Sequence, residues 1–137
     1  MAQSIRTRVG EVFLDTNGFV VIRYNDIAEI DIQDLSEVED AVLQLSNGQP
    51  MYLIIMLGKY SVTTKSARYH LKQQRKSGPL GEAVVARSLP QRVIGNFYAR
   101  LKGDKFPVRM FSSRERATRW LLELKDRQST SFQALTA

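Results

Sequence analysis

An apolar run over residues 51–57 lies between two segments with helical periodicity and ends at Gly58. The run is too short to span a bilayer, but its length and its content of Ile, Leu and Tyr are typical of a strand buried on both faces. Such a strand needs packed layers on both sides of its sheet. The sequence therefore predicts an α/β fold with a mixed, mainly parallel sheet.

Four further strands are predicted around this central one. Residues 5–14 and 19–24 are β-rich and are separated by an Asn-Gly turn, which predicts an N-terminal antiparallel hairpin. Residues 82–87 and 108–111 complete a five-stranded sheet. Arg109 interrupts the apolar pattern of the last strand, which places that strand near an edge.

About four helices are predicted from apolar residues at helical spacing. Asp34 and Ser112 each precede a Glu by three residues, the pattern of a capping box, and are the expected N-caps of the first and last helix. In the third helix, Val93, Ile94, Phe97 and Leu101 form the expected apolar stripe. Residues 1–127 are expected to form one domain, followed by a polar C-terminal tail over residues 128–137.

The composition excludes several classes of function. The chain of 137 residues has no cysteine and a single histidine, His70, which excludes thiol nucleophiles, disulfides, iron–sulfur clusters and cysteine-containing zinc sites. No second ligand lies near His70, so we expect a structural or exposed histidine and neither metal nor cofactor. The acidic residues gather on the first helix, as on a solvated face, so we expect no catalytic residues. The absence of an N-terminal signal-peptide core predicts a cytoplasmic protein.

Charge is distributed unevenly along the chain. Residues 1–50 contain three Lys or Arg against nine Asp or Glu, whereas residues 51–137 contain seventeen against five. No acid occurs between Ala41 and Gly81, so a surface built from that stretch should carry a positive potential. This division is compatible with self-association of an acidic face with a basic one, and equally with an acidic partner.

Several segments together resemble a known family. They are the strand and glycine loop over residues 53–58, the segment from 83–86 to Asn96-Phe97, and residues 111–117 followed by Trp120-Leu121. Over residues 19–124 the chain resembles the small bacterial SpoIIAA-like proteins of STAS type. The resemblance implies a β-α superhelix around a mixed sheet and a non-enzymatic role in binding proteins or ligands.

In that family, anti-sigma factor antagonists carry a Ser or Thr at the start of the helix after the central strand, and a partner kinase phosphorylates it. Here the corresponding loop over residues 58–64 lacks the acidic residue of the family motif, so only the location is carried over. Its hydroxyls and a lysine are nevertheless candidates for phosphorylation or for anion binding at a helix start: Ser61, Thr63, Thr64 and Lys59. The alternative is that Thr63 or Thr64 caps the following helix.

Basic side chains cover one face of that second helix, expected over residues 64–76. They form a candidate surface for a partner or an anion, although such faces are often simply solvated: Lys65, Arg68, Lys72, Arg75 and Lys76. Nucleic acid is not favoured, because the chain has no recognised nucleic-acid motif. A P-loop is excluded, since Gly58-Lys59 lacks the upstream glycine and the Ser or Thr after the lysine.

These observations predict a non-enzymatic regulatory or interaction module that binds a protein partner or itself as a homo-oligomer. Phosphorylation of Ser61, Thr63 or Thr64 is the sharpest form of this hypothesis. The alternative is a protein that binds an anionic small molecule, a lipid headgroup or nucleic acid through the basic face of the second helix. The sequence leaves the identity of the partner or ligand open.

Overall fold

A computed structural model describes residues 3–73, 79–102 and 106–136. Its main sheet has six strands in the order β1-β2-β3-β5-β7-β8, antiparallel from β1 to β3 and parallel from β3 to β8. These strands are β1 (Ser4–Thr7), β2 (Gly10–Leu14), β3 (Val20–Tyr24), β5 (Met51–Met56), β7 (Pro79–Val85) and β8 (Val108–Phe111). The predicted mixed α/β sheet, its hairpin and its edge position for residues 108–111 are confirmed.

The predicted number of strands in this sheet, five, is wrong. The segment 5–14 is divided into β1 and β2, which form a hairpin of their own in which Thr7 faces Gly10. The turn residues Arg8 and Val9 are neither Gly, Pro, Asn nor Asp, so the usual turn signal is missing. Glycine at position 10 allows β2 and β3 to approach closely, since a Cβ there would lie 2.2 Å from the backbone oxygen of Arg23.

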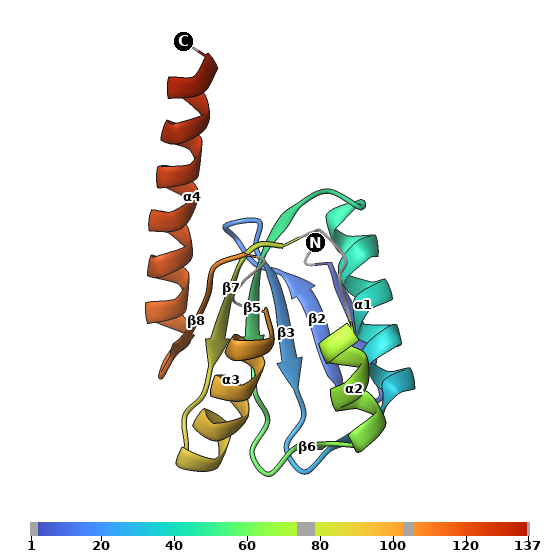
Figure 1. The fold of residues 1–137 in the computed structure, drawn as a ribbon. Helices are drawn as coiled ribbons and strands as arrows, with labels where there is room; N and C mark the ends of the chain where they lie inside the picture. The colour runs from blue at the N-terminus through green and yellow to red at the C-terminus, as the bar shows by residue number, and fades with distance from the viewer. Residues whose placement is uncertain (1–2, 74–78, 103–105, 137) are drawn as a thin grey trace.

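Helices cover both faces of the sheet (Figure 1). Helices α1 (Ile32–Ser46), α2 (Lys65–Gln73) and α3 (Leu89–Lys102) lie on one face, and α4 (Arg114–Thr136) packs on the other against β5, β7 and β8. Two short strands, β4 (Glu29–Ile30) and β6 (Val62–Thr63), pair in parallel beside α2. The four predicted helices are confirmed.

Helix α1 begins one turn earlier than predicted. Its N-cap is Asp31, and the carboxylate of Asp34 accepts a hydrogen bond from the Asp31 amide at 2.9 Å. The Asp34 carboxylate also accepts from Arg8, with Nε 2.9 Å from Oδ1, and this bond holds the pKa of Asp34 below its ordinary value. The pair joins the β1–β2 turn to the start of α1.

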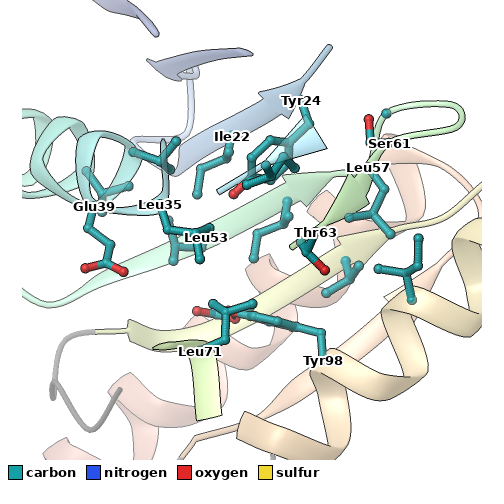
Figure 2. Close-up of a pocket in the computed structure, with 18 of the residues that line it drawn as sticks. Ile22, Tyr24, Leu35, Glu39, Leu53, Leu57, Ser61, Thr63, Leu71 and Tyr98 are labelled. Atoms are coloured by element: carbon teal, nitrogen blue, oxygen red, sulfur yellow. Dashed lines mark hydrogen bonds between the residues drawn. The ribbon is translucent and has the colours of Figure 1, made fainter. Parts of the chain in front are cut away.

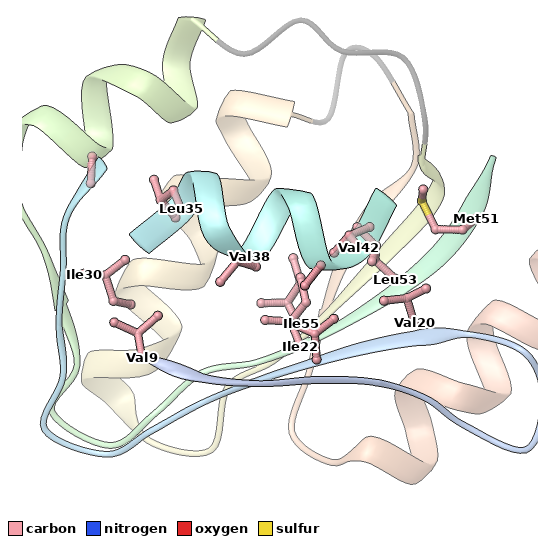
Figure 3. Close-up of a cluster of buried hydrophobic side chains, with 13 residues drawn as sticks. Val9, Val20, Ile22, Ile30, Leu35, Val38, Val42, Met51, Leu53 and Ile55 are labelled. Carbon is pink, nitrogen blue, oxygen red and sulfur yellow. The ribbon is translucent and has the colours of Figure 1, made fainter. Parts of the chain in front are cut away.

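The core is divided by the sheet into two layers. On the α1 side, Ile22 and Leu53 pack against Leu35 and Val38 (Figure 3). On the α4 side, alternate residues of the same strands pack against the buried residues of α4, in a cluster that includes Phe19, Ile54, Ala83, Ala117, Leu121 and Leu124. Strand β5 is therefore buried on both faces, as its continuous apolar run predicts.

Residues 128–136, expected as a polar tail, instead continue helix α4, whose last turns extend past the end of the sheet (Figure 1). Gln128 anchors this part of the helix, because its Oε1 accepts a hydrogen bond from the Tyr52 hydroxyl and its Nε2 donates to the Leu80 oxygen at 3.2 Å. Within the described residues, none of the helices has the length and apolarity needed to cross a membrane.

Adjacent leucines of α4 provide a test of how this helix packs. Leu121 is fully buried and Leu122 is 43% exposed. We expect Leu121→Ala to lower the free energy of unfolding by about 2–5 kcal/mol, because it leaves a cavity under the helix. Leu122→Ala should change it by less than about 1 kcal/mol. Urea denaturation followed by circular dichroism measures both, and equal losses would contradict the packing described.

Candidate binding site at the carboxyl ends of the parallel strands

The loops that follow β3 and β5 are held together by three hydrogen bonds. The Ser61 hydroxyl donates to the Asn25 oxygen at 2.6 Å, the Ile27 amide donates to the Lys59 oxygen at 2.7 Å, and the Lys59 amide donates to an Asp26 carboxylate oxygen at 2.7 Å. We call residues 25–28 and 57–61 the paired loops. They form a defined surface at the carboxyl ends of the strands.

Glycine at position 58 allows this close approach. A Cβ on Gly58 would lie 2.1 Å from the Asn25 oxygen and 2.4 Å from the Ser61 Oγ. The backbone oxygen of Asn25 has no room to move, since it already accepts from Ser61. Any larger residue at position 58 would therefore push the paired loops apart.

The structure gives the three candidate hydroxyls different roles. The Ser61 side chain is buried and its hydroxyl is committed to Asn25. The Thr64 hydroxyl accepts from the Ala67 amide at 3.1 Å and donates to Asp31 Oδ1 at 2.8 Å, so Thr64 caps α2, as in the alternative interpretation. Among the described residues, the Thr63 hydroxyl makes no hydrogen bond, and its backbone oxygen accepts from Arg68 Nη1 at 2.5 Å.

The predicted basic residues are only partly brought to this surface. Lys59 lies with its Nζ 5.4 Å from the centre of the Tyr60 ring, and Lys65 is exposed at the start of α2. Arg68 borders the cavity described below. The side chain of Lys72, and both Arg75 and Lys76, lie outside the described part of the chain.

His70 joins two helices. Its Nε2 lies 2.9 Å from Glu39 Oε1, which connects α2 to α1. Among the described residues, no group of three or more His, Asp or Glu side chains could hold a metal ion. This pairing agrees with the structural role expected for His70.

A cavity of about 220 Å³ lies between the sheet and helices α1, α2 and α3. Side chains from all of these elements converge on it (Figure 2). Its lining is mostly aliphatic and aromatic, and includes Ile22, Leu53, Leu71 and Ile94. The cavity reaches the paired loops at Gly58 and Ser61, so it adjoins the predicted site.

The polar floor of the cavity was not predicted from the sequence. Glu82 on β7 is 2% exposed, and its Oε2 accepts a hydrogen bond from the Tyr98 hydroxyl at 2.5 Å. Burial, together with the charge of Glu82, raises the pKa of Tyr98 well above its ordinary value, and the same causes raise that of Tyr24. In the sequence, Glu82 precedes an apolar segment and is therefore interpreted as the start of the strand. No local pattern connects Glu82 with Tyr98, which follows sixteen residues later on α3, so the hydrogen bond could not be predicted.

Apolar side chains extend from the cavity to the surface. Val62 and Phe97 line the cavity and are 55% and 46% exposed. On α3, the predicted apolar stripe is only partly buried, because Val93 is 65% exposed while Ile94 faces the cavity. The packed face of this helix also contains Gln91 and Gly95, so the apolar pattern predicted this face only in part. The side chain of Leu101 lies outside the described part of the chain.

The Glu82–Tyr98 hydrogen bond can be tested by removing one hydroxyl. Tyr98→Phe should lower the free energy of unfolding at neutral pH by about 1–3 kcal/mol, because the buried carboxylate loses a donor. A tyrosine pKa that is higher in the folded than in the unfolded state gives stability that is complete below about pH 10 and is lost as the pH rises further. The alkaline loss should therefore be smaller in Tyr98→Phe. Urea denaturation at several pH values measures both effects, with the exposed Tyr69→Phe as the control.

Comparisons with known proteins support this fold. The crystal structure of an uncharacterized protein of the DUF3478 family from Shewanella loihica PV-4, which has a SpoIIAA-like fold, superposes with a TM-score of 0.57 over 88% of this chain and 92% of that chain, at 10% identity. At this identity the likeness concerns the fold alone, and it confirms the predicted SpoIIAA-like architecture. No curated protein matches the chain. A model of a domain of unknown function, DUF7793, matches residues 12–125, so the chain belongs to the DUF7793 family.

Proposed function

We propose that the chain is a non-enzymatic interaction module that binds a partner protein on the paired loops and the exposed face of α3. The proposal rests on one observation: Ile27 and Tyr60 are exposed to solvent although both have a strained, left-handed backbone conformation. Both residues have positive φ, 56° and 61°, and their side chains are 79% and 68% exposed. A strained backbone without burial of the side chain lowers the stability of the fold. We therefore attribute these two residues to binding rather than to folding.

The free energy of this backbone strain can be estimated. A left-handed conformation costs a residue with a Cβ roughly 1–2 kcal/mol, and it is particularly unusual for a β-branched residue such as Ile27. Neither side chain regains this free energy by burial, since both project into solvent. Strained residues held in place by surrounding hydrogen bonds are concentrated at functional sites. The bonds between the paired loops supply this support.

Helix α3 continues the apolar surface. Leu89, Val93 and Phe97 are spaced by four residues, share one face of the helix, and are 73%, 65% and 46% exposed. An exposed apolar stripe of this kind is typical of a protein-binding surface. Phe97 also lines the cavity, so the stripe and the cavity form a continuous apolar groove.

The size of the cavity favours a partner's side chains over a free ligand. Small-molecule sites usually enclose roughly 300–1,000 Å³, and this cavity has about 220 Å³. It can receive a few apolar side chains of a segment that lies along the groove, in the way that amphipathic helices dock into grooves. Lys59 and Lys65 beside the groove favour a segment with acidic residues flanking its apolar face.

Phosphorylation, as part of this proposal, is assigned to Thr63. A phosphate on Thr64 would break the cap of α2 and face Asp31, and the Ser61 hydroxyl is buried. Thr63 lines the groove and lies next to Arg68 and Lys65. A phosphate there would pair with the Arg68 guanidinium and add negative charge to a surface that favours an acidic partner, so modification would weaken binding.

The proposal predicts opposite effects on stability and on binding for one substitution. Asn tolerates the left-handed conformation, so Ile27→Asn should leave the free energy of unfolding unchanged or raise it by up to about 1 kcal/mol. The same variant should reduce partner binding by about tenfold or more, because it removes an exposed apolar contact. Phe97→Ser should also reduce binding.

The measurement is affinity capture of the tagged chain from cells of the source organism, followed by titration calorimetry with the purified partner. Leu122→Ser is the matched control, since Leu122 is a comparably exposed apolar residue on α4. A partner retained equally by all variants would contradict the proposed surface. Capture of the chain alone, with sedimentation showing a dimer that Ile27→Asn dissociates, would identify a second copy as the occupant.

A further inference from the structure

A second depression lies at the other side of α3, where β8 ends and α4 begins. It has a volume of about 650 Å³ and is lined by residues of α3, β8 and α4. Four arginines border it, namely Arg92 on α3, Arg109 on β8, and Arg116 and Arg119 on α4. Glu123 is the single carboxylate among its described lining residues.

Among the described lining residues, Glu123 offsets at most one of these four positive charges. The two side-chain ion pairs among the described residues join Arg8 to Asp34 and His70 to Glu39, so neither involves an arginine of the depression. The Arg109 guanidinium lies 5.5 Å from the centre of the Phe111 ring, which leaves its charge without a carboxylate partner in the described part of the chain. Four guanidinium groups around one hollow repel one another, and a bound anion would offset this repulsion. The arrangement therefore favours a ligand that carries several negative charges.

The side chains that line the depression also indicate which class of anion it would bind. All four cations are arginines, whose planar guanidinium groups form paired hydrogen bonds to phosphate oxygens. The start of α4 is already capped, because the Arg116 amide donates to the Ser113 Oγ at 3.3 Å, so an anion would be held by side chains. The volume of the depression lies within the usual range for a small-molecule site of roughly 300–1,000 Å³.

We infer that this depression binds a small molecule with at least two phosphate groups, held by Arg92, Arg109, Arg116 and Arg119. This site is separate from the proposed docking groove, since it is lined by β8 and α4 where the groove is lined by α1 and α2. The inferred site also differs from the basic face of the second helix, on which the sequence analysis placed its alternative of anion binding.

Trp120 allows binding to be measured directly. It is the one tryptophan of the chain, it lines the depression, and its ring lies 5.5 Å from that of Phe111. A ligand beside it should change the intrinsic fluorescence in a saturable manner. Pyrophosphate is the probe, and orthophosphate at matched ionic strength is the comparison.

We expect pyrophosphate to bind more tightly than orthophosphate, with an affinity that falls as salt is added. Arg116→Gln and Arg119→Gln should each weaken pyrophosphate binding by about tenfold, the effect of losing one charged hydrogen bond. Arg127→Gln is the matched control, because it removes the same charge from an exposed position of α4 outside the depression. Its affinity should stay within about twofold of the unmodified chain.

Three outcomes would overturn the inference. One is the absence of a saturable signal in both fluorescence and calorimetry. Another is an equal loss in Arg127→Gln, which would indicate attraction by overall charge alone. The third is binding of an acidic peptide without binding of pyrophosphate, which would assign the depression to a protein. Circular dichroism of each variant shows that its fold is retained.

Discussion

The parallel pairing of β3 with β5 is the constraint on which the site depends. The pairing runs from Val20 opposite Leu53 to Arg23 opposite Met56, so the two strands end at the same level. The chains that leave them must then lie side by side, and Gly58 allows their backbones to touch. Strands β4 and β6 extend the same parallel arrangement beyond the sheet. A shift of one residue would turn Ile22 and its neighbours to the opposite face and would separate the paired loops.

The two candidate surfaces share α3 and differ in chemistry. Toward the cavity this helix presents Ile94 and Phe97, and toward the depression at β8 it presents Arg92. Gly95 lets the helix lie close to the sheet, since a Cβ there would be 2.8 Å from the Met110 sulfur. The tight packing leaves little freedom for α3 to move between the two surfaces, so an apolar partner and an anion could be bound at the same time.

Much of the fold was predictable because it rests on local patterns. The central apolar strand, the Asn-Gly hairpin and the four helices were each confirmed. The first hairpin was missed because Arg8 and Val9 carry no turn signal, and two aspartates three residues apart, Asp31 and Asp34, made the first helix start ambiguous. The segment over residues 58–64 follows the central strand as predicted, although it includes the short strand β6. The Glu82–Tyr98 hydrogen bond and the exposed face of α3 were not predicted, because both depend on which face of the helix packs against the sheet.

The uneven charge of the sequence also has a structural explanation. Within the part of the chain that the structure describes, five of the nine acids in the first fifty residues accept hydrogen bonds or form ion pairs, namely Asp15, Asp26, Asp31, Asp34 and Glu39. Their carboxylates stabilise turns, helix caps and contacts between elements, so part of the negative charge is already paired with groups of the same chain. The arginines around the depression have no such partners among the described residues. These arginines are therefore available to the anionic ligand that we infer for the depression, whereas much of the acidic charge of the first fifty residues is used within the fold.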